Sequence, residues 1–176
     1  MTAELVWFKR DLRIDDHAPL VAAAKKGPVF CLYIYEPELI GADDFASRHL
    51  LFINDSLQEL DTSLRQLGSR LVICRGDAVR VLANIKAQIG FDCIRVHQET
   101  TNGVSFARDR AVLQWASDNG VNVIEYRQNG VVRRLSSRDG WAGQWQAFAT
   151  APLVSAPRVL QDGSGDYPSV GVLPPG

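Results

Sequence analysis

Short apolar segments alternate with amphipathic, helix-like segments from the N-terminus to about residue 127. The apolar segments are rich in Val, Ile, Leu, Phe, Tyr and Cys and show little strict alternation, which is typical of strands covered on both faces. We therefore expect strands at residues 4–8, 28–35, 70–75, 92–97 and 121–126. Strands separated by helices in this way predict βαβ units around a parallel sheet.

The segments between these strands carry a helical period. In residues 46–67, apolar residues at spacings of three and four form a single stripe. Asp16 is expected to cap the first helix, and Asp77 to cap a helix over residues 78–89. A further helix is expected over residues 104–119. Right-handed crossovers then predict a doubly wound, Rossmann-like α/β fold with five parallel strands and helices on both faces.

The C-terminal part departs from this pattern. One short helix is expected around Trp141, Trp145 and Phe148. Residues 151–176 hold five of the eight prolines and four of the fourteen glycines, a composition typical of a linker or a draped extension. We therefore expect one α/β domain over residues 1–150, followed by this linker.

Composition narrows the class of protein. A chain of 176 residues, 46% of them hydrophobic, can bury a core without disulfides or a structural metal. The net charge of −1 argues against a dedicated nucleic-acid-binding module. Apolar runs reach only about eight residues, well below the roughly 20 that a membrane crossing needs, and no basic-then-apolar leader opens the chain. These features predict a cytoplasmic protein without membrane contact.

The spacing of cysteine and histidine predicts no metal site. Cys31, Cys74 and Cys93 are odd in number, widely spaced and placed inside apolar segments, so buried free thiols are expected. The three histidines stand 32 and 48 residues apart, and the sequence has no Cys-x-x-Cys pair.

Polar residues follow three of the expected strands. Ligands of a doubly wound sheet bind beyond the carboxyl ends of its strands. The candidate binding residues are therefore Phe8, Lys9, Arg10, Asp11, Leu12, Arg13, Tyr35, Glu36, His97, Gln98 and Glu99. The charged turn after the first strand suits either a polar ligand or an ion-paired scaffold. Because a Gly-x-Gly-x-x-Gly fingerprint, a P-loop and a nucleophile elbow are all missing from the sequence, no catalytic residue is assigned.

Residues 5–20, with the sequence LVWFKRDLRIDDHAPL, resemble the start of the DNA photolyase and cryptochrome family. The resemblance extends over about residues 4–157. Further similar segments are residues 29–37, 47–49, 67–71, 75–77 and 107–109.

This resemblance implies an N-terminal α/β domain that can hold an antenna chromophore: a reduced folate, a deazaflavin or FMN. The antenna passes its energy to FAD, which in this family belongs to a larger C-terminal helical domain, expected after Gly176. The partners implied are that FAD domain and, through the full-length protein, DNA. The chain alone is then not catalytic, and its parent is expected to be a deoxyribodipyrimidine photolyase, a light-driven carbon–carbon lyase of DNA repair.

Two departures from the family pattern bear on the chromophore. Lys9 stands where Arg or Gln is more usual, and Val104-Ser105 replaces the Asn-Glu pair of folate-binding members. FMN or a deazaflavin is therefore expected in preference to folate. The alternatives are a cryptochrome-like photosensor or protein-interaction domain with an empty antenna cleft, and a free-standing nucleotide-binding enzyme, which the missing phosphate loop disfavours.

Overall fold

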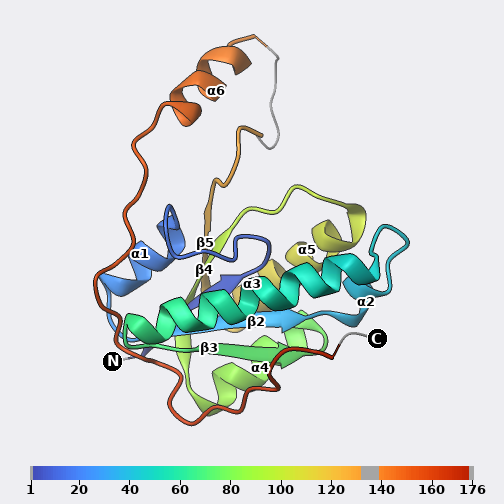
Figure 1. Ribbon diagram of the computed structural model, residues 1–176, viewed down its shortest axis with the longest axis vertical. Coiled ribbons are helices and arrows are strands. Elements are labelled where there is room, and N and C mark those ends of the chain that lie inside the picture. The colour runs from blue at the N-terminus through green and yellow to red at the C-terminus, as the bar shows by residue number, and fades with distance from the viewer. Residues whose placement is uncertain (1, 132–138, 175–176) are drawn as a thin grey trace.

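The protein is built around one parallel sheet (Figure 1). The computed structural model describes residues 2–131 and 139–174. The strands are arranged in the order β3-β2-β1-β4-β5, and all four neighbouring pairs are parallel. Their bounds are β1 (Ala3–Phe8), β2 (Val29–Tyr35), β3 (Leu71–Arg75), β4 (Phe91–His97) and β5 (Asn122–Tyr126). The predicted doubly wound α/β sheet is confirmed.

Helices cover both faces of the sheet. Val6 and Phe8 of β1 face one core with α1 (Ala18–Ala24) and α3 (Ser47–Gln66). Leu5 and Trp7 face a second core with α4 (Ala78–Gln88) and α5 (Gly103–Asp118). Both faces of β1 are therefore apolar, which explains its unbroken hydrophobic run. Among the described residues, no helix has the length and apolarity needed to cross a membrane.

The start of α1 differs from the prediction. His17, not Asp16, is the N-cap, because its Nδ1 accepts a hydrogen bond from the backbone N–H of Leu20 at 3.1 Å. Asp16 has a positive φ of 49° and pairs with the C-terminal tail. Its N–H donates to the carbonyl of Val154 at 2.8 Å, and its Oδ1 accepts from the N–H of Val154 at 3.2 Å. The prediction for Asp77 is confirmed, since it caps α4 as expected.

Two short helices complete the described elements. α2 (Pro37–Ile40) directly follows β2 and was not predicted, because four residues carry no detectable period. The helix expected around the tryptophans is confirmed as α6 (Trp141–Ala149), which stands away from the sheet in Figure 1. Its two tryptophans, Trp141 and Trp145, are 43% and 46% exposed.

The proline- and glycine-rich tail lies along the body of the domain (Figure 1). It forms no helix over residues 151–174 and only an isolated bridge to Val29. Leu160 and Tyr167 are nevertheless buried, and the N–H of Val170 donates to the carbonyl of Ile73 on β3 at 2.9 Å. The tail is therefore fastened to the sheet by both apolar and hydrogen-bonding contacts.

The three thiols are unpaired, as predicted, but they are not equally buried. Cys31 and Cys74 are buried, whereas Cys93 is partly exposed. Burial raises the pKa of Cys31 to about 12. A thiol with so high a pKa stays protonated at neutral pH, so Cys31 serves as an apolar core residue.

Candidate functional site

A cavity of about 420 Å³ opens beyond the carboxyl ends of β1 and β2. This volume falls in the range of small-molecule sites. α2, α3 and α5 all contribute to its lining. Its walls are apolar and aromatic, and its charged side chains come from the strand ends, from α5 and from Asp44 in the loop after α2. The wall residues include Tyr33, Leu39, Ile40, Phe45, Phe52 and Ile53.

A buried ionic network forms the floor of this cavity. The Arg108 guanidinium donates to Asp109, Glu36 and Glu99 through three different nitrogens. The Lys9 ammonium lies 3.3 Å from Asp109 Oδ1 and 3.7 Å from Glu99 Oε2. These five side chains are at most 10% exposed. We call these five residues, together with Arg10 at the cavity mouth, the ionic floor.

The Trp7 indole packs against two cations of the ionic floor, Lys9 and Arg108. The Arg108 guanidinium carbon lies 4.7 Å from the Trp7 ring centroid, and the Lys9 ammonium lies 5.2 Å from it. Cations placed over an indole face are attracted by its quadrupole. The indole therefore helps to hold the Arg108 guanidinium in one orientation beneath the cavity.

Two carboxylates of the ionic floor have different proton affinities. Burial raises the pKa of Glu36 to about 7, although the charge of Arg108 acts in the opposite direction. Burial also acts to raise the pKa of Glu99, but a hydrogen bond from Thr101 and the charges of Lys9 and Arg108 lower it overall. Glu99 is therefore an anion at neutral pH, whereas Glu36 can exchange a proton there.

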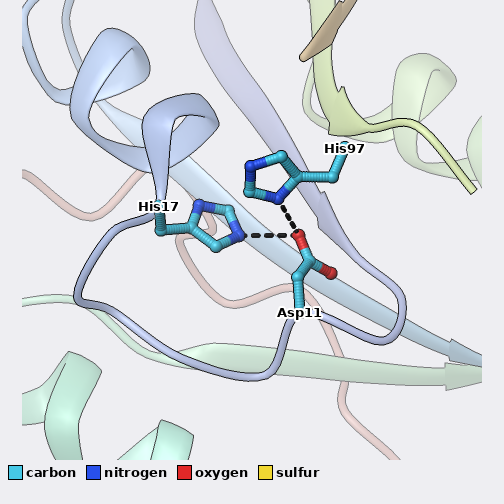
Figure 2. A group of neighbouring side chains, drawn as sticks. All are labelled: Asp11, His17 and His97. Atoms are coloured by element: carbon cyan, nitrogen blue, oxygen red, sulfur yellow. Dashed lines mark hydrogen bonds and ion pairs between the residues drawn. The ribbon is translucent and has the colours of Figure 1, made fainter. Parts of the chain in front are cut away.

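Behind the turn that follows β1, one carboxylate binds two histidines (Figure 2). Asp11 Oδ2 lies 2.8 Å from His17 Nε2 and 2.6 Å from His97 Nδ1, and Asp11 Oδ1 accepts the backbone N–H of Lys9 at 2.7 Å. The three side chains are buried. Burial acts to raise the pKa of Asp11, but hydrogen bonds from His17 and His97 lower it well below its ordinary value. Asp11 is thus a buried anion held by imidazole N–H groups.

The ligand atoms of Asp11, His17 and His97 lie within 4.8 Å of one another, a spacing compatible with a metal ion. The position of the proton on the His17 ring favours a hydrogen-bonding role over a metal-binding one. Since Leu20 N–H donates to His17 Nδ1, the neutral ring carries its proton on Nε2 and directs it at Asp11. A cation bound to His17 Nε2 would move this proton to Nδ1, where it would meet the N–H of Leu20. The trio therefore fits a hydrogen-bonded anchor, and the absence of a metal stays a prediction.

The structure separates the candidate binding residues into three groups. Arg13 lines neither of the two larger cavities and instead donates to the carbonyls of Asp15 and Asp16. A smaller crevice of about 230 Å³, between the ends of β1 and β4, includes Asp11, His97 and Gln98. The large cavity brings together Phe8, Lys9, Arg10, Leu12, Tyr35, Glu36 and Glu99.

Residues of α3 and α5 that line the cavity were not among the candidates. Arg108 is the most consequential, because it joins Glu36 to Glu99. Its signal in the sequence was an Arg-Asp pair on the helix expected over residues 104–119. Charged pairs on helices are most often solvated, so this signal gains weight only once α5 is placed beside the end of β2.

Comparison with known proteins identifies the family. Residues 4–142 match the family model of DNA photolyase. The chain belongs to the DNA photolyase family. Its fold and its similarity place it with the N-terminal α/β domain of photolyases and cryptochromes.

Individual relatives come from both branches of the family. The chain is 36% identical over 126 residues to a deoxyribodipyrimidine photo-lyase of Agrobacterium fabrum, covering 69% of this chain and 25% of that protein. It is 38% identical over 123 residues to cryptochrome-1 of Arabidopsis thaliana, covering 69% of this chain and 18% of that protein. The crystal structure of a class III photolyase from Agrobacterium tumefaciens superposes with a TM-score of 0.78 at 27% identity, over 96% of this chain and 36% of that one. The chain thus spans about a third or less of the length of these relatives.

Proposed function

We propose that this chain is the antenna domain of a photolyase-like flavoprotein and that its large cavity binds a planar, light-absorbing heterocycle. The observation that carries the proposal is the cavity itself, which combines aromatic walls with a hydrogen-bonding floor at the carboxyl ends of β1 and β2. Apolar surfaces bury the faces of a ring system, and a few fixed polar groups orient its edge. A bound antenna absorbs near-ultraviolet or blue light and passes the excitation energy on.

The residues proposed to hold the chromophore come from both sides of the cavity. Phe45 and Phe52 would contact the faces of the ring, while Glu36 and Arg108 would bind its polar edge. Arg10, whose side chain is 55% exposed, lies at the mouth, where it can order the remainder of the ligand. FMN or a deazaflavin remains our preferred ligand over folate.

The wider activity belongs to the whole protein in this proposal. FAD and the pyrimidine-dimer site would lie in a helical domain to which residues 151–176 lead, and DNA would be bound by the complete cytoplasmic protein. The repair reaction would be that of a deoxyribodipyrimidine photolyase. This α/β domain contributes light capture and no bond-breaking residue of its own.

Titration of the chain with FMN, a deazaflavin and a reduced folate tests the proposal. We expect one of them to bind saturably, with a shift of its absorption band and quenching of its emission. The Arg10→Ala variant should weaken that binding, whereas Arg13→Ala, a matched exposed arginine of the same turn, should leave it unchanged. Absence of binding by all three chromophores would contradict the proposal.

A cryptochrome-like photosensor or protein-interaction domain is the second candidate. The observation that favours it is the pair of exposed tryptophans on α6, because exposed aromatic residues are frequent in protein interfaces. In this case the cavity would stay empty. The purified full-length protein would then absorb as FAD alone, without an additional antenna band, and loss of the exposed indoles in a Trp141→Ala/Trp145→Ala variant would weaken binding to its partner protein.

A further inference from the structure

We infer that the cavity selects an uncharged, phosphate-free heterocycle, because each cation that lines it in the described part of the chain is already paired with a carboxylate. This inference rests on the proposed function and narrows its choice of FMN or a deazaflavin: the occupant would be a ring system with a neutral side chain, and the phosphate of FMN would be disfavoured.

The first step is the charge balance of the ionic floor. Lys9 lies 3.3 Å from Asp109, Arg10 lies 2.9 Å from Glu99, and Arg108 lies 2.8 Å from Asp109. These three cations face three carboxylates, since Glu36 also binds Arg108. When Glu36 is ionised, above its pKa of about 7, the floor therefore offers no surplus positive charge to a phosphate.

The mouth of the cavity supplies no unpaired Lys or Arg from the described residues, because Arg10 there is paired with Glu99. The Asp44 carboxylate also lines the cavity and adds a negative charge. It accepts a hydrogen bond from the side-chain amide of Asn102 at 3.1 Å. Phe45 and Phe52 contribute apolar surface beside it. A dianionic phosphate beside Asp44, Phe45 and Phe52 would meet a carboxylate and aromatic carbon, an environment that disfavours its charge.

The pairs of the floor are also difficult to separate. The side chains of Glu99 and Arg108 are only 5% and 7% exposed. Turning Arg108 toward a phosphate would leave a buried carboxylate without its partner, and an unpaired buried charge is strongly unfavourable. The Trp7 indole stacked under Arg108 opposes the same movement.

A neutral ring edge suits the floor as it stands. The Arg108 guanidinium supplies donors, and Glu36 beside it supplies a carboxyl group. Flavins and deazaflavins carry an edge on which carbonyl oxygens alternate with an N–H group, so this edge can accept from Arg108 and donate to Glu36 without changing the charge balance.

Two matched ligand pairs test the inference: riboflavin with FMN, and 5-deazariboflavin with its 5′-phosphate. Within each pair the ring is identical and only the phosphate differs. Fluorescence titration of the chain should give a Kd that is lower for the phosphate-free member by about tenfold or more. Equal affinities, or tighter binding of the phosphate, would overturn the inference while leaving the antenna proposal intact.

A charge-neutralising variant ties the selectivity to the floor. Glu36→Gln removes one carboxylate and should reduce the preference for the phosphate-free ligand several-fold. Glu38→Gln, on the exposed side of α2 and outside the cavity lining, is the matched control and should keep the full preference. Should Glu36→Gln fail to fold, Asp44→Asn at the mouth makes the same test. An unchanged preference in the folded variant would overturn the charge-balance explanation.

The two proposals fail in different ways. If reduced folate binds and none of the four flavin ligands does, the inference is overturned and the antenna proposal survives. If no ligand of either kind binds, the antenna proposal is overturned as well.

Discussion

Asp11 was a candidate binding residue in the turn after β1, but the structure places its carboxylate between two buried histidines. The Arg10 and Arg13 side chains do not pair with its carboxylate, and Arg13 binds only its backbone carbonyl. The carboxylate instead receives hydrogen bonds from His17, the cap of α1, and from His97 at the end of β4. One buried carboxylate thus joins a strand, a turn and a helix start. Asp11 supports the site from behind, while Arg10 faces the cavity.

The Asp11→Ala variant should therefore lose stability first and ligand binding only as a result. Three N–H groups, from Lys9, His17 and His97, would be left without their acceptor in the protein interior. We expect a loss of about 3–5 kcal/mol in the free energy of unfolding, measured by urea denaturation. Arg13→Ala should change it by less than about 0.5 kcal/mol. An Asp11→Ala protein as stable as the wild type would show that the histidines find other acceptors.

Glu36 gives the free energy of unfolding a pH dependence of opposite sign to the usual carboxylate. Its folded pKa of about 7 lies above its ordinary value of 4.5 because burial disfavours the charged form. The unfolded chain therefore releases this proton first, and the contribution to stability falls as the pH rises from 4.5 to about 7. The slope for one proton is at most about 1.4 kcal/mol per pH unit.

Glu36→Gln should remove that fall, since an amide does not titrate. Urea denaturation of both proteins at intervals between pH 5 and pH 7 measures the difference. His17 acts in the opposite sense, because burial lowers its pKa and stability is lost as the pH falls below 6.5, but it is common to both proteins. If the difference between variant and wild type does not change with pH, Glu36 ionises at its ordinary pKa.

At the scale of elements, α3 carries both a core face and a cavity face. Leu57, Leu60 and Leu64 are buried on the sheet, as the apolar stripe predicts. Near its N-terminus, Phe52 lies off that stripe, is 73% exposed and lines the cavity. An aromatic residue that contributes so little to the core is well placed to contact a ligand.

Phe52→Ala should accordingly weaken ligand binding without weakening the fold. Loss of one stacking surface predicts about 1 kcal/mol, or roughly fivefold in Kd. Leu51→Ala on the same helix is the control, since Leu51 is 48% exposed and does not line the cavity. Fluorescence titration with the chromophore that binds measures both variants. Equal effects of the two substitutions would contradict a direct contact by Phe52.

The elements that sequence patterns predicted well are those that depend on local physics. The strand at residues 4–8 and the helix at 46–67 agree with β1 and α3 to within one residue at each end. Apolar runs and 3.6-residue periods record burial directly. Seven of the candidate binding residues line the large cavity because strand ends meet at one edge of the sheet.

Other features were beyond local patterns because they depend on distant partners. Arg108 binds Glu36, which lies 72 residues away in the sequence, and no sequence pattern near either residue predicts this pair. Asp16 was predicted to cap α1, but Val154 of the tail, 138 residues away in the sequence, binds its side chain, and His17 is the cap. The buried contacts of Leu160 likewise depend on where the tail lies on the body.

At the scale of the whole molecule, the double winding of the sheet is what assembles the site. α3 packs on one face of the sheet and α5 on the other, yet both reach the carboxyl edge and contribute to one cavity. The walls come mainly from the first half of the fold, and Arg108 comes from the second. Loosening of either half should therefore open the cavity.

The tail contributes to the stability of the whole domain in this structure. Leu160 is 4% exposed and packs in the core beneath α3, whereas Leu153 of the same tail is 80% exposed. Leu160→Ala should lower the free energy of unfolding by about 2–4 kcal/mol, and Leu153→Ala should leave it unchanged within about 0.5 kcal/mol. Thermal or urea denaturation of the two variants compares them. Equal stability of both would show that the tail separates from the body in solution.

The stacking of Lys9 and Arg108 on Trp7 has an optical consequence. A buried indole that shares the wall of a cavity with its occupant lies within a few ångströms of it, so its ultraviolet emission should be lost when a visible-absorbing guest enters. Trp7 is thereby a built-in reporter of occupancy, and a Trp7→Phe protein would keep the guest while losing that signal.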